Sequence, residues 1–166
     1  MTLAEAATQA EALAEEGKER ELAQLRSQWD EELEAAARSR DYRERAVAYR
    51  AIAQFRYRQK LELLRRGLDD ESPACRGSAL LSLERLSRDH PSVVNSVRPL
   101  LHELASNDGN EAVRRLAIVA LKNGSPERST IQILASLGED DEQARELREA
   151  AAKVAQLLRR KAGPRG

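Results

Sequence analysis

A short pattern recurs four times along the chain, and it constrains the fold more than any other feature. Arginine is followed three residues later by alanine and then by an aliphatic or small residue, in copies that begin at Arg43, Arg76, Arg114 and Arg148. The residues before these arginines serve as anchors, lie 33, 38 and 34 residues apart, and are Tyr42, Cys75, Val113 and Leu147. A period of about 20–50 residues indicates supersecondary units that stack on their neighbours and bury one continuous core.

The composition favours helices nearly throughout. The chain has 166 residues, of which 41% are apolar, 34% charged and 3% aromatic, with eight glycines and five prolines. Ala, Leu, Glu and Arg dominate, and all four are good helix formers. A single cysteine, Cys75, excludes a disulfide framework. With no secretory leader and no long apolar run, these features predict a cytoplasmic protein.

Glycine and proline mark the expected helix ends. Three prolines are placed to open helices, because proline fits the first helical turn: Pro73, Pro91 and Pro126. Four glycines follow apolar stretches and are expected to end helices: Gly67, Gly109, Gly124 and Gly138. Pro99 should bend or interrupt the apolar run around it. Neither residue type occurs between Trp29 and Arg66, so this segment is expected to form one long helix or two helices that abut at a bend.

Two stretches, LLRRGLDDESPACRGSALLSLERL and LLHELASNDGNEAVRRLAIVAL, resemble the HEAT repeat. In that family an apolar helix is followed by an acidic turn and by a second helix that opens with an apolar residue and arginine. The resemblance covers residues 58–158 well and 20–57 weakly. It implies an all-α fold, a short α-solenoid of three to four HEAT-like helical hairpins with an N-terminal helical extension. It also implies a ladder of turn aspartates and helix-opening arginines that pairs Asp70 with Arg76, Asp108 with Arg114, and Asp141 with Arg148.

Three segments follow from this division of the chain. Residues 1–40 are expected to form an acidic helical extension or cap, residues 41–162 the HEAT-like solenoid, and residues 163–166 a disordered tail. The Ala-rich start of the first segment has little apolar bulk to hold it to a core. A homodimer through the N-terminal helices is therefore a further hypothesis.

Charge is segregated along the first part of the chain. Residues 1–37 contain ten acidic and three basic residues, a net charge of −7, whereas residues 38–66 reverse these numbers to +7. In a continuous helix, four arginines of the basic segment would lie in one line beside its tyrosines: Arg43, Arg50, Arg58 and Arg65. This line could bind the phosphates of nucleic acid. Alternatively, the acidic segment folds back on the basic one, or the two neutralise each other across a dimer.

The sequence offers no catalytic, cofactor-binding or metal-ligating group that stands out. His90 and His102 lack the spacing of a zinc site, and Cys75 lies at an apolar repeat position typical of a small core residue. No glycine-rich phosphate loop occurs. We therefore expect a protein that is not an enzyme and has no cofactor; a lyase-like helper is a third and weaker hypothesis.

The favoured function is protein binding, as a scaffold or adaptor module. The resemblance implies that the second helix of each pair lines the concave face of the solenoid. Candidate partner-binding residues on these helices are Arg45, Tyr49, Leu81, Arg85, Leu116 and Val119. The alternative for the apolar members is packing against a neighbouring helix.

Overall fold

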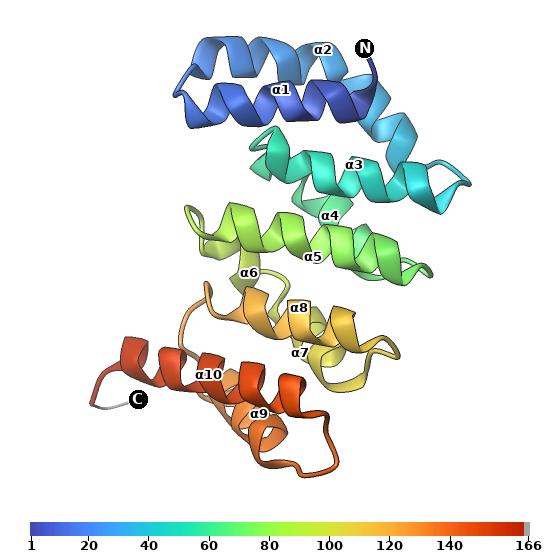
Figure 1. Ribbon diagram of the computed structural model, residues 1–166. Helices are drawn as coiled ribbons and strands as arrows, with labels where there is room; N and C mark the ends of the chain where they lie inside the picture. Colours follow the sequence, from blue (N-terminus) through green and yellow to red (C-terminus); the bar gives the residue numbers. More distant parts are fainter. Residues whose placement is uncertain (165–166) are drawn as a thin grey trace. The chain divides into compact units, whose positions relative to one another are not determined.

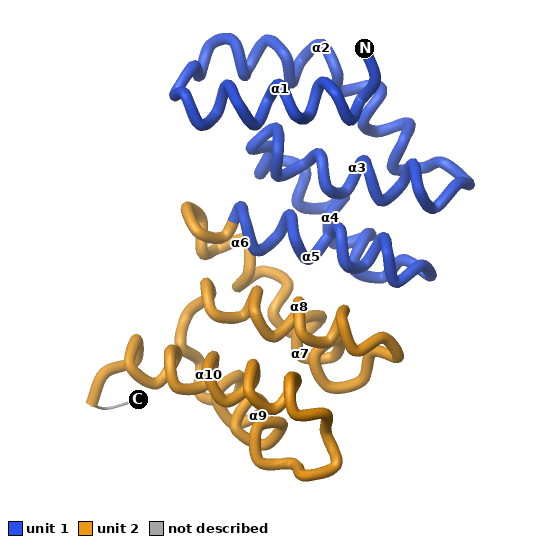
Figure 2. Tube along the Cα trace, viewed as in Figure 1, with its two compact units in different colours: residues 1–86 blue, residues 87–166 orange. Residues whose placement is uncertain are grey.

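The computed structural model describes residues 1–164, which form helices joined by turns and contain no strand (Figure 1). The expected all-α fold of a helical solenoid is confirmed. The chain divides into two compact units, unit 1 at residues 1–86 and unit 2 at residues 87–166, which Figure 2 colours separately. Each unit is described by itself.

Unit 1 stacks its helices in two layers. Its elements are α1 (Leu3–Glu15), α2 (Glu19–Ala37), α3 (Tyr42–Gln54), the short 3-10 helix η1 (Arg58–Lys60), α4 (Leu61–Leu68) and α5 (Pro73–Ser87), whose last residue lies in unit 2. In Figure 1, α1, α3 and α5 form the front layer, with α4 behind α3 and α5. The first two helices form a hairpin, and both contact α3.

The hairpin of α1 and α2 starts at a capping residue and reverses direction at a glycine. The Thr2 hydroxyl accepts a hydrogen bond from the Glu5 amide, 3.2 Å away, and so caps α1. Gly17 has a φ of 73°, the left-handed conformation that lets the chain reverse between the two helices. Three alanines of α1 are fully buried against the rest of unit 1: Ala6, Ala7 and Ala10. Small side chains therefore let α1 lie close to its neighbours.

The expectation of one long helix between Trp29 and Arg66, or of two helices that abut at a bend, is wrong, because the chain breaks twice within this segment. Residues 38–41 separate α2 from α3, and residues 55–57 separate α3 from η1. Arg56 adopts a φ of 53°, which is uncommon for a residue other than glycine. The Arg26 Nη1 atom donates to the carbonyls of Phe55 and Arg56 at 3.0 and 3.3 Å, so a side chain from α2 holds this turn.

Gly67 lies inside α4 and does not end it, contrary to expectation. A Cβ atom at this position would lie 2.9 Å from Ala79 Cβ and 3.0 Å from Tyr49 Cδ1. The missing side chain therefore lets α4 approach both α3 and α5. Ser82 of α5 is buried and donates to the Tyr49 carbonyl of α3, which ties these two parallel helices together.

Unit 2 contains two helical hairpins and a short leading helix. Its elements are α6 (Ser92–Asn95), α7 (Arg98–Asn107), α8 (Glu111–Leu121), α9 (Arg128–Glu139) and α10 (Arg145–Ala162). The expected interruption at Pro99 is confirmed, because α6 ends before it and Pro99 lies in the first turn of α7. Gly138 lies within α9, where a Cβ atom would be 3.2 Å from both Cβ and N of Ala152. As at Gly67, glycine here permits close packing of two helices.

Gly163 ends α10 at a φ of 78°, and of the predicted disordered tail, residues 165 and 166 lie outside the described residues. None of the helices that the structure describes is both long and apolar enough to cross a bilayer.

Candidate functional site

The burial of residues in α3 corrects the register of the first repeat. Tyr42, the first anchor, is 50% exposed, whereas the corresponding Cys75 is buried. Burial matches instead when Arg45 takes the place of Arg43, because Ala48 and Tyr49 are then buried three and four positions later. The first copy of the repeat therefore begins two residues beyond the predicted position.

Arg45 forms a largely shielded ion pair with the turn that precedes α5. Its Nε and Nη2 atoms donate to the two carboxylate oxygens of Asp70 at 2.9 and 3.0 Å, and the two side chains are 12% and 8% exposed. Burial opposes ionisation of Asp70, but hydrogen bonds from Arg45 and from the Ser72 amide outweigh it and lower the pKa of this carboxyl. The hydrogen bonds from Arg45 to Asp70 likewise raise the pKa of the guanidinium. The pair is thus charged and joins neighbouring repeats.

The other expected ladder contacts are realised in different ways. Arg76 donates to the backbone carbonyl of Asp70 at 2.8 Å. Arg148 pairs with Asp141 at 3.7 Å, as expected. Arg114 donates to the Ala105 carbonyl and to the Gln143 side chain, both at 2.9 Å, and not to Asp108.

The front of unit 1 presents two parallel rows of side chains that we call the α3/α5 face. Residues at helical intervals of three and four lie opposite the buried side of each helix. The face consists of Arg43, Val47, Arg50 and Gln54 on α3 and of Ala74, Ser78, Leu81 and Arg85 on α5. Val47 is 38% and Leu81 41% exposed, so both expose apolar surface. In unit 1, α4 lies behind these helices, on the side away from the face (Figure 1).

The comparisons with known proteins identify the repeat. Residues 30–103 match the family model of HEAT repeats. This segment, less than half of the chain, is similar to HEAT repeats. No curated protein and no solved structure matches it. The match spans α3, α4 and α5, so the α3/α5 face lies within the HEAT repeats.

The structure distributes the candidate partner-binding residues over three environments. Leu81 and Arg85 lie on the α3/α5 face. Leu116 and Val119 are half-buried on α8 in unit 2. Tyr49 is 3% exposed, and Arg45 is engaged with Asp70, so neither of these two offers an open contact surface, and the expectation for them is wrong. Tyr49 fills the core position that leucine has in the next repeat.

The four predicted phosphate-binding arginines do not form one line in the structure. Arg43 and Arg50 lie on α3, Arg58 on η1 and Arg65 on α4, beyond the turn at Arg56. Two of them already contact carboxylates of their own helix ends: Arg43 lies 3.2 Å from Asp41 and Arg65 3.5 Å from Glu62. The geometry on which the nucleic-acid alternative depended is therefore absent.

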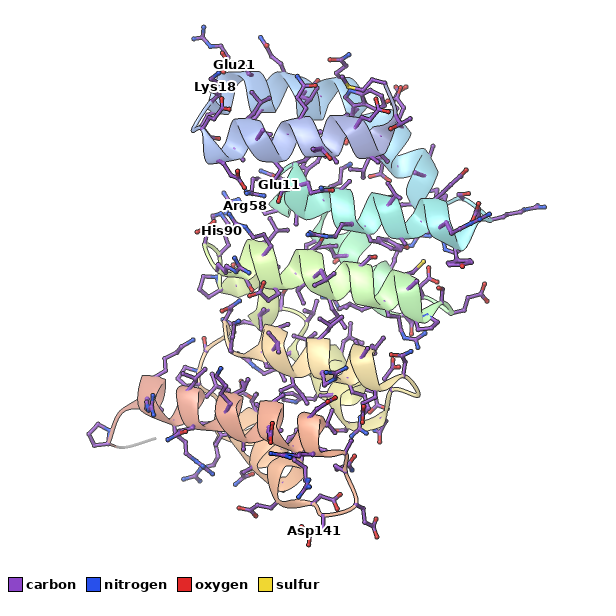
Figure 3. The ribbon with its side chains drawn as sticks, in the orientation of Figure 1. Glu11, Lys18, Glu21, Arg58, His90 and Asp141 are labelled. Carbon is purple, nitrogen blue, oxygen red and sulfur yellow. The ribbon has the colours of Figure 1, made fainter. Side chains whose placement is uncertain are left out.

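The acidic segment instead folds back on the basic one. Lys60 Nζ lies 2.8 Å from Asp30 and 2.6 Å from Glu34, both on α2, and the Tyr57 hydroxyl donates to Asp30 at 2.9 Å. Burial disfavours the charged lysine, but its bonds to Asp30 and Glu34 outweigh this effect and raise its pKa. At the edge of unit 1 that carries the labels Glu11 and Arg58 in Figure 3, Gln54 donates to Glu11 at 3.4 Å. Intramolecular pairing thus takes up part of the segregated charge.

The groups that could carry chemistry are dispersed. Within residues 1–164, no three His, Cys, Asp or Glu side chains are grouped so as to hold a metal ion. Burial raises the pKa of the Cys75 thiol, which donates to the Tyr42 carbonyl at 3.2 Å. Unit 2 has a shallow hollow of about 330 Å³, and its lining combines two apolar side chains with four polar ones: Ser106, Gln132, Ile133, Ser136, Leu137 and Asp140.

Sequence reasoning missed Val47 and Arg50 as neighbours of Leu81. The predicted first copy begins two residues too early, which aligns Val47 with the buried Leu80 of the second copy. In the corrected register, Arg50 corresponds to Leu81, five positions after the repeat arginine in both copies. An exposed position would then have been expected for both residues.

Proposed function

We propose that this protein is a non-enzymatic interaction module, a scaffold or adaptor, that binds a partner protein through the α3/α5 face. The observation that carries the proposal is the exposure of Val47 and Leu81 on adjacent helices of one HEAT unit. Exposed apolar side chains grouped on one surface and bordered by polar residues are typical of protein interaction sites. HEAT repeats commonly serve as interaction scaffolds, which supports the same function.

The location of the module is part of the proposal. Cys75 is a free, buried thiol, which is typical of proteins from reducing compartments such as the cytoplasm. The chain would meet its partner there.

A photo-crosslinking experiment tests the surface. A photoreactive amino acid replaces Leu81 in one variant and Gln28, an exposed residue of α2, in the control. Both chains are irradiated in an extract of the organism that makes the protein, and adducts are mapped to peptides by mass spectrometry. We expect a protein adduct at position 81 that is absent at position 28. Equal labelling at the two positions, or none at position 81, would refute this surface.

A further inference from the structure

The second half of α10 exposes cations on both sides of one apolar side chain. Lys153, Leu157 and Arg160 are spaced by four and three residues, so they share one exposed face of the helix, which we call the α10 face. Leu157 is 38% exposed. Arg159 adds positive charge at the edge of this face, and residues 150–162 contain no carboxylate. Such a surface is complementary to two carboxylates that flank small side chains.

The cations of the α10 face are not engaged within the described part of the chain. Lys153 and Arg160 make no ion pair or hydrogen bond there. The nearest carboxylate along the helix, Glu149, is bonded to Arg145 at 2.8 Å. Lys161, by contrast, donates to two backbone carbonyls of unit 2 and is not part of the face. The helix dipole favours cations at this end of α10, but their exposed side chains remain available to a partner.

Helix α1 has the opposite charge. It contains three carboxylates and no lysine or arginine, and it is the one helix within residues 1–164 whose charged residues are all acidic. Four exposed residues at intervals of three and four form what we call the α1 face: Glu5, Thr8, Ala12 and Glu15. The third carboxylate, Glu11, is half-buried, lies off this face and contacts a glutamine of α3. The α1 face therefore presents a carboxylate at each end and small side chains between them.

The carboxylates of the α1 face lack a counter-charge. Neither Glu5 nor Glu15 makes an ion pair in the described part of the chain. Lys18, in the turn after α1, is bonded to Glu16 at 3.0 Å, and Arg20 lies on α2. Glu15 is also the last residue of α1, where the negative end of the helix dipole disfavours a carboxylate. A cation from outside the hairpin would relieve this repulsion.

We propose that the α10 face of one copy of this chain binds the α1 face of a second copy. This inference goes beyond the proposed function and does not use the α3/α5 face. Charge complementarity selects the occupant, because the chain has 28 basic and 28 acidic residues in total, yet α1 carries only acidic ones and the second half of α10 only basic ones. Each pair of copies leaves one face of each kind free, so the association is head-to-tail.

The two faces match in pattern as well as in charge. Leu157 lies between Lys153 and Arg160, as small side chains lie between Glu5 and Glu15. The two carboxylates are ten residues apart, about 15 Å along the helix, and the two cations seven residues, about 10 Å. Long, flexible Lys and Arg side chains span this difference. Because the apolar centre is small, we expect a weak association that depends on charge.

Sedimentation velocity of the full chain over a series of protein concentrations tests the contact at two salt concentrations. The Debye length is about 30 Å at 0.01 M and about 3 Å at 1 M ionic strength. We expect the mean sedimentation coefficient to rise with protein concentration at low salt and to keep the value of a monomer at high salt. A chain that stays monomeric under both conditions, or that associates more strongly at high salt, would overturn the proposal.

Charge reversal on each face identifies the two surfaces. Glu15→Arg and Arg160→Glu should each weaken self-association about tenfold or more. An equimolar mixture of these two variants should restore it, because each chain supplies the face that the other has lost. The matched controls, Glu31→Arg on α2 and Arg66→Glu on α4, reverse exposed charges outside both faces and should have little effect. Circular dichroism melting verifies that these surface variants keep the fold.

The remaining outcomes also decide the question. If only one of the two reversals weakens association, or if the controls act equally, the pairing of these faces is wrong. Nucleic acid is the other polyanion that the α10 face would attract. A chain that stays monomeric but binds a labelled DNA duplex at low salt, and loses this binding in Arg160→Glu, would assign the face to nucleic acid. The crosslink at position 81 lies on the α3/α5 face, so it tests the proposed function separately.

Discussion

The two units join successive helical hairpins with different polar chemistry at corresponding places. In unit 1 the link is ionic and shielded, with Arg45 and Asp70 in contact through two hydrogen bonds. In unit 2 the matching arginine, Arg114, bonds to a backbone carbonyl and to the amide of Gln143. The carboxylate pair at the acidic turn of unit 2 lies within one hairpin: Arg148 of α10 is 3.7 Å from Asp141, which is 99% exposed.

The contrast shows that corresponding positions of the repeat can form contacts of different strength. A charge pair shielded from water depends on both partners, because removal of one leaves the other poorly solvated. A pair in open solvent contributes little, because water and salt replace it. The polar link in unit 1 should therefore be far more sensitive to substitution than that in unit 2.

The largest expected effect is the loss of Asp70. Asp70→Ala should lower the free energy of unfolding by about 3 kcal/mol, since Arg45 would lose its buried carboxylate. The matched control in unit 2, Asp141→Ala, should cost less than about 1 kcal/mol. Urea denaturation of both variants measures the difference. Equal losses in the two variants would contradict the distinction between shielded and exposed links.

The cost of replacing a glycine at a helix–helix contact gives a second comparison of the units. Gly67→Ala should cost about 1–2 kcal/mol, because overpacking against Ala79 and Tyr49 exceeds the gain in helix propensity. Gly138→Ala in unit 2 should cost less, since its nearest contacts to Ala152 are 3.2 Å rather than 2.9 Å. Gly109→Ala, with no atom within 4 Å of the new Cβ, is the control and should be neutral or slightly stabilising. The order of thermal midpoints among the three variants checks the prediction.

A buried hydroxyl distinguishes the front helices of the two units. Ser82 bonds to the Tyr49 carbonyl, whereas Ala120 occupies the same position in α8. Ser82→Ala should cost about 1 kcal/mol, because the hydroxyl that bonds to the backbone of α3 is lost. Ser78→Ala on the exposed side of α5 is the control, and urea denaturation is again the measurement. A stabilised Ser82→Ala variant would show that the hydroxyl link is not needed in unit 1.

The sequence was sufficient for the helical class, the repeat and several helix ends. These features depend on local sequence, so Pro73 and Pro99 occupy the places expected for a helix start and for an interruption. The period also underlies the resemblance to HEAT repeats, which the match of residues 30–103 supports.

The break after α3 could not be predicted, because its cause lies far away in the sequence. Arg56 has a positive φ with no glycine or proline nearby, and Arg26 of α2 holds the carbonyls that the turn exposes. A stabilising contact between residues 29 and 30 positions apart leaves no local signature. The nucleic-acid alternative depended on this break being absent.

The prediction of the candidate site residues was wrong in part, because the register of the first repeat was misplaced. Tyr42 was taken as the first apolar anchor, although it is exposed, and this choice displaced the repeat by two residues. Aromatic side chains mark cores less reliably than aliphatic ones, because they often lie partly exposed. Burial of Ala48 and Tyr49 was needed to restore the register and to bring Val47 and Arg50 to the surface beside Leu81.

The smallest expected effect concerns pH, and it belongs to unit 2. His102 of α7 lies 2.8 Å from the Thr130 hydroxyl of α9, and burial, with the nearby Arg98 cation, lowers its pKa, although Glu127 opposes this shift. Below about pH 6.5 the unfolded chain therefore binds a proton that the folded chain does not, so stability falls as the pH decreases from about 6.5 toward the depressed pKa.

His102→Gln should remove this loss, because glutamine can bond to Thr130 without titrating. The control His90→Gln should retain it. Thermal midpoints of the three chains from pH 7.5 to 5 make the comparison, and parallel curves for all three would show that the junction of α7 and α9 does not sense protons.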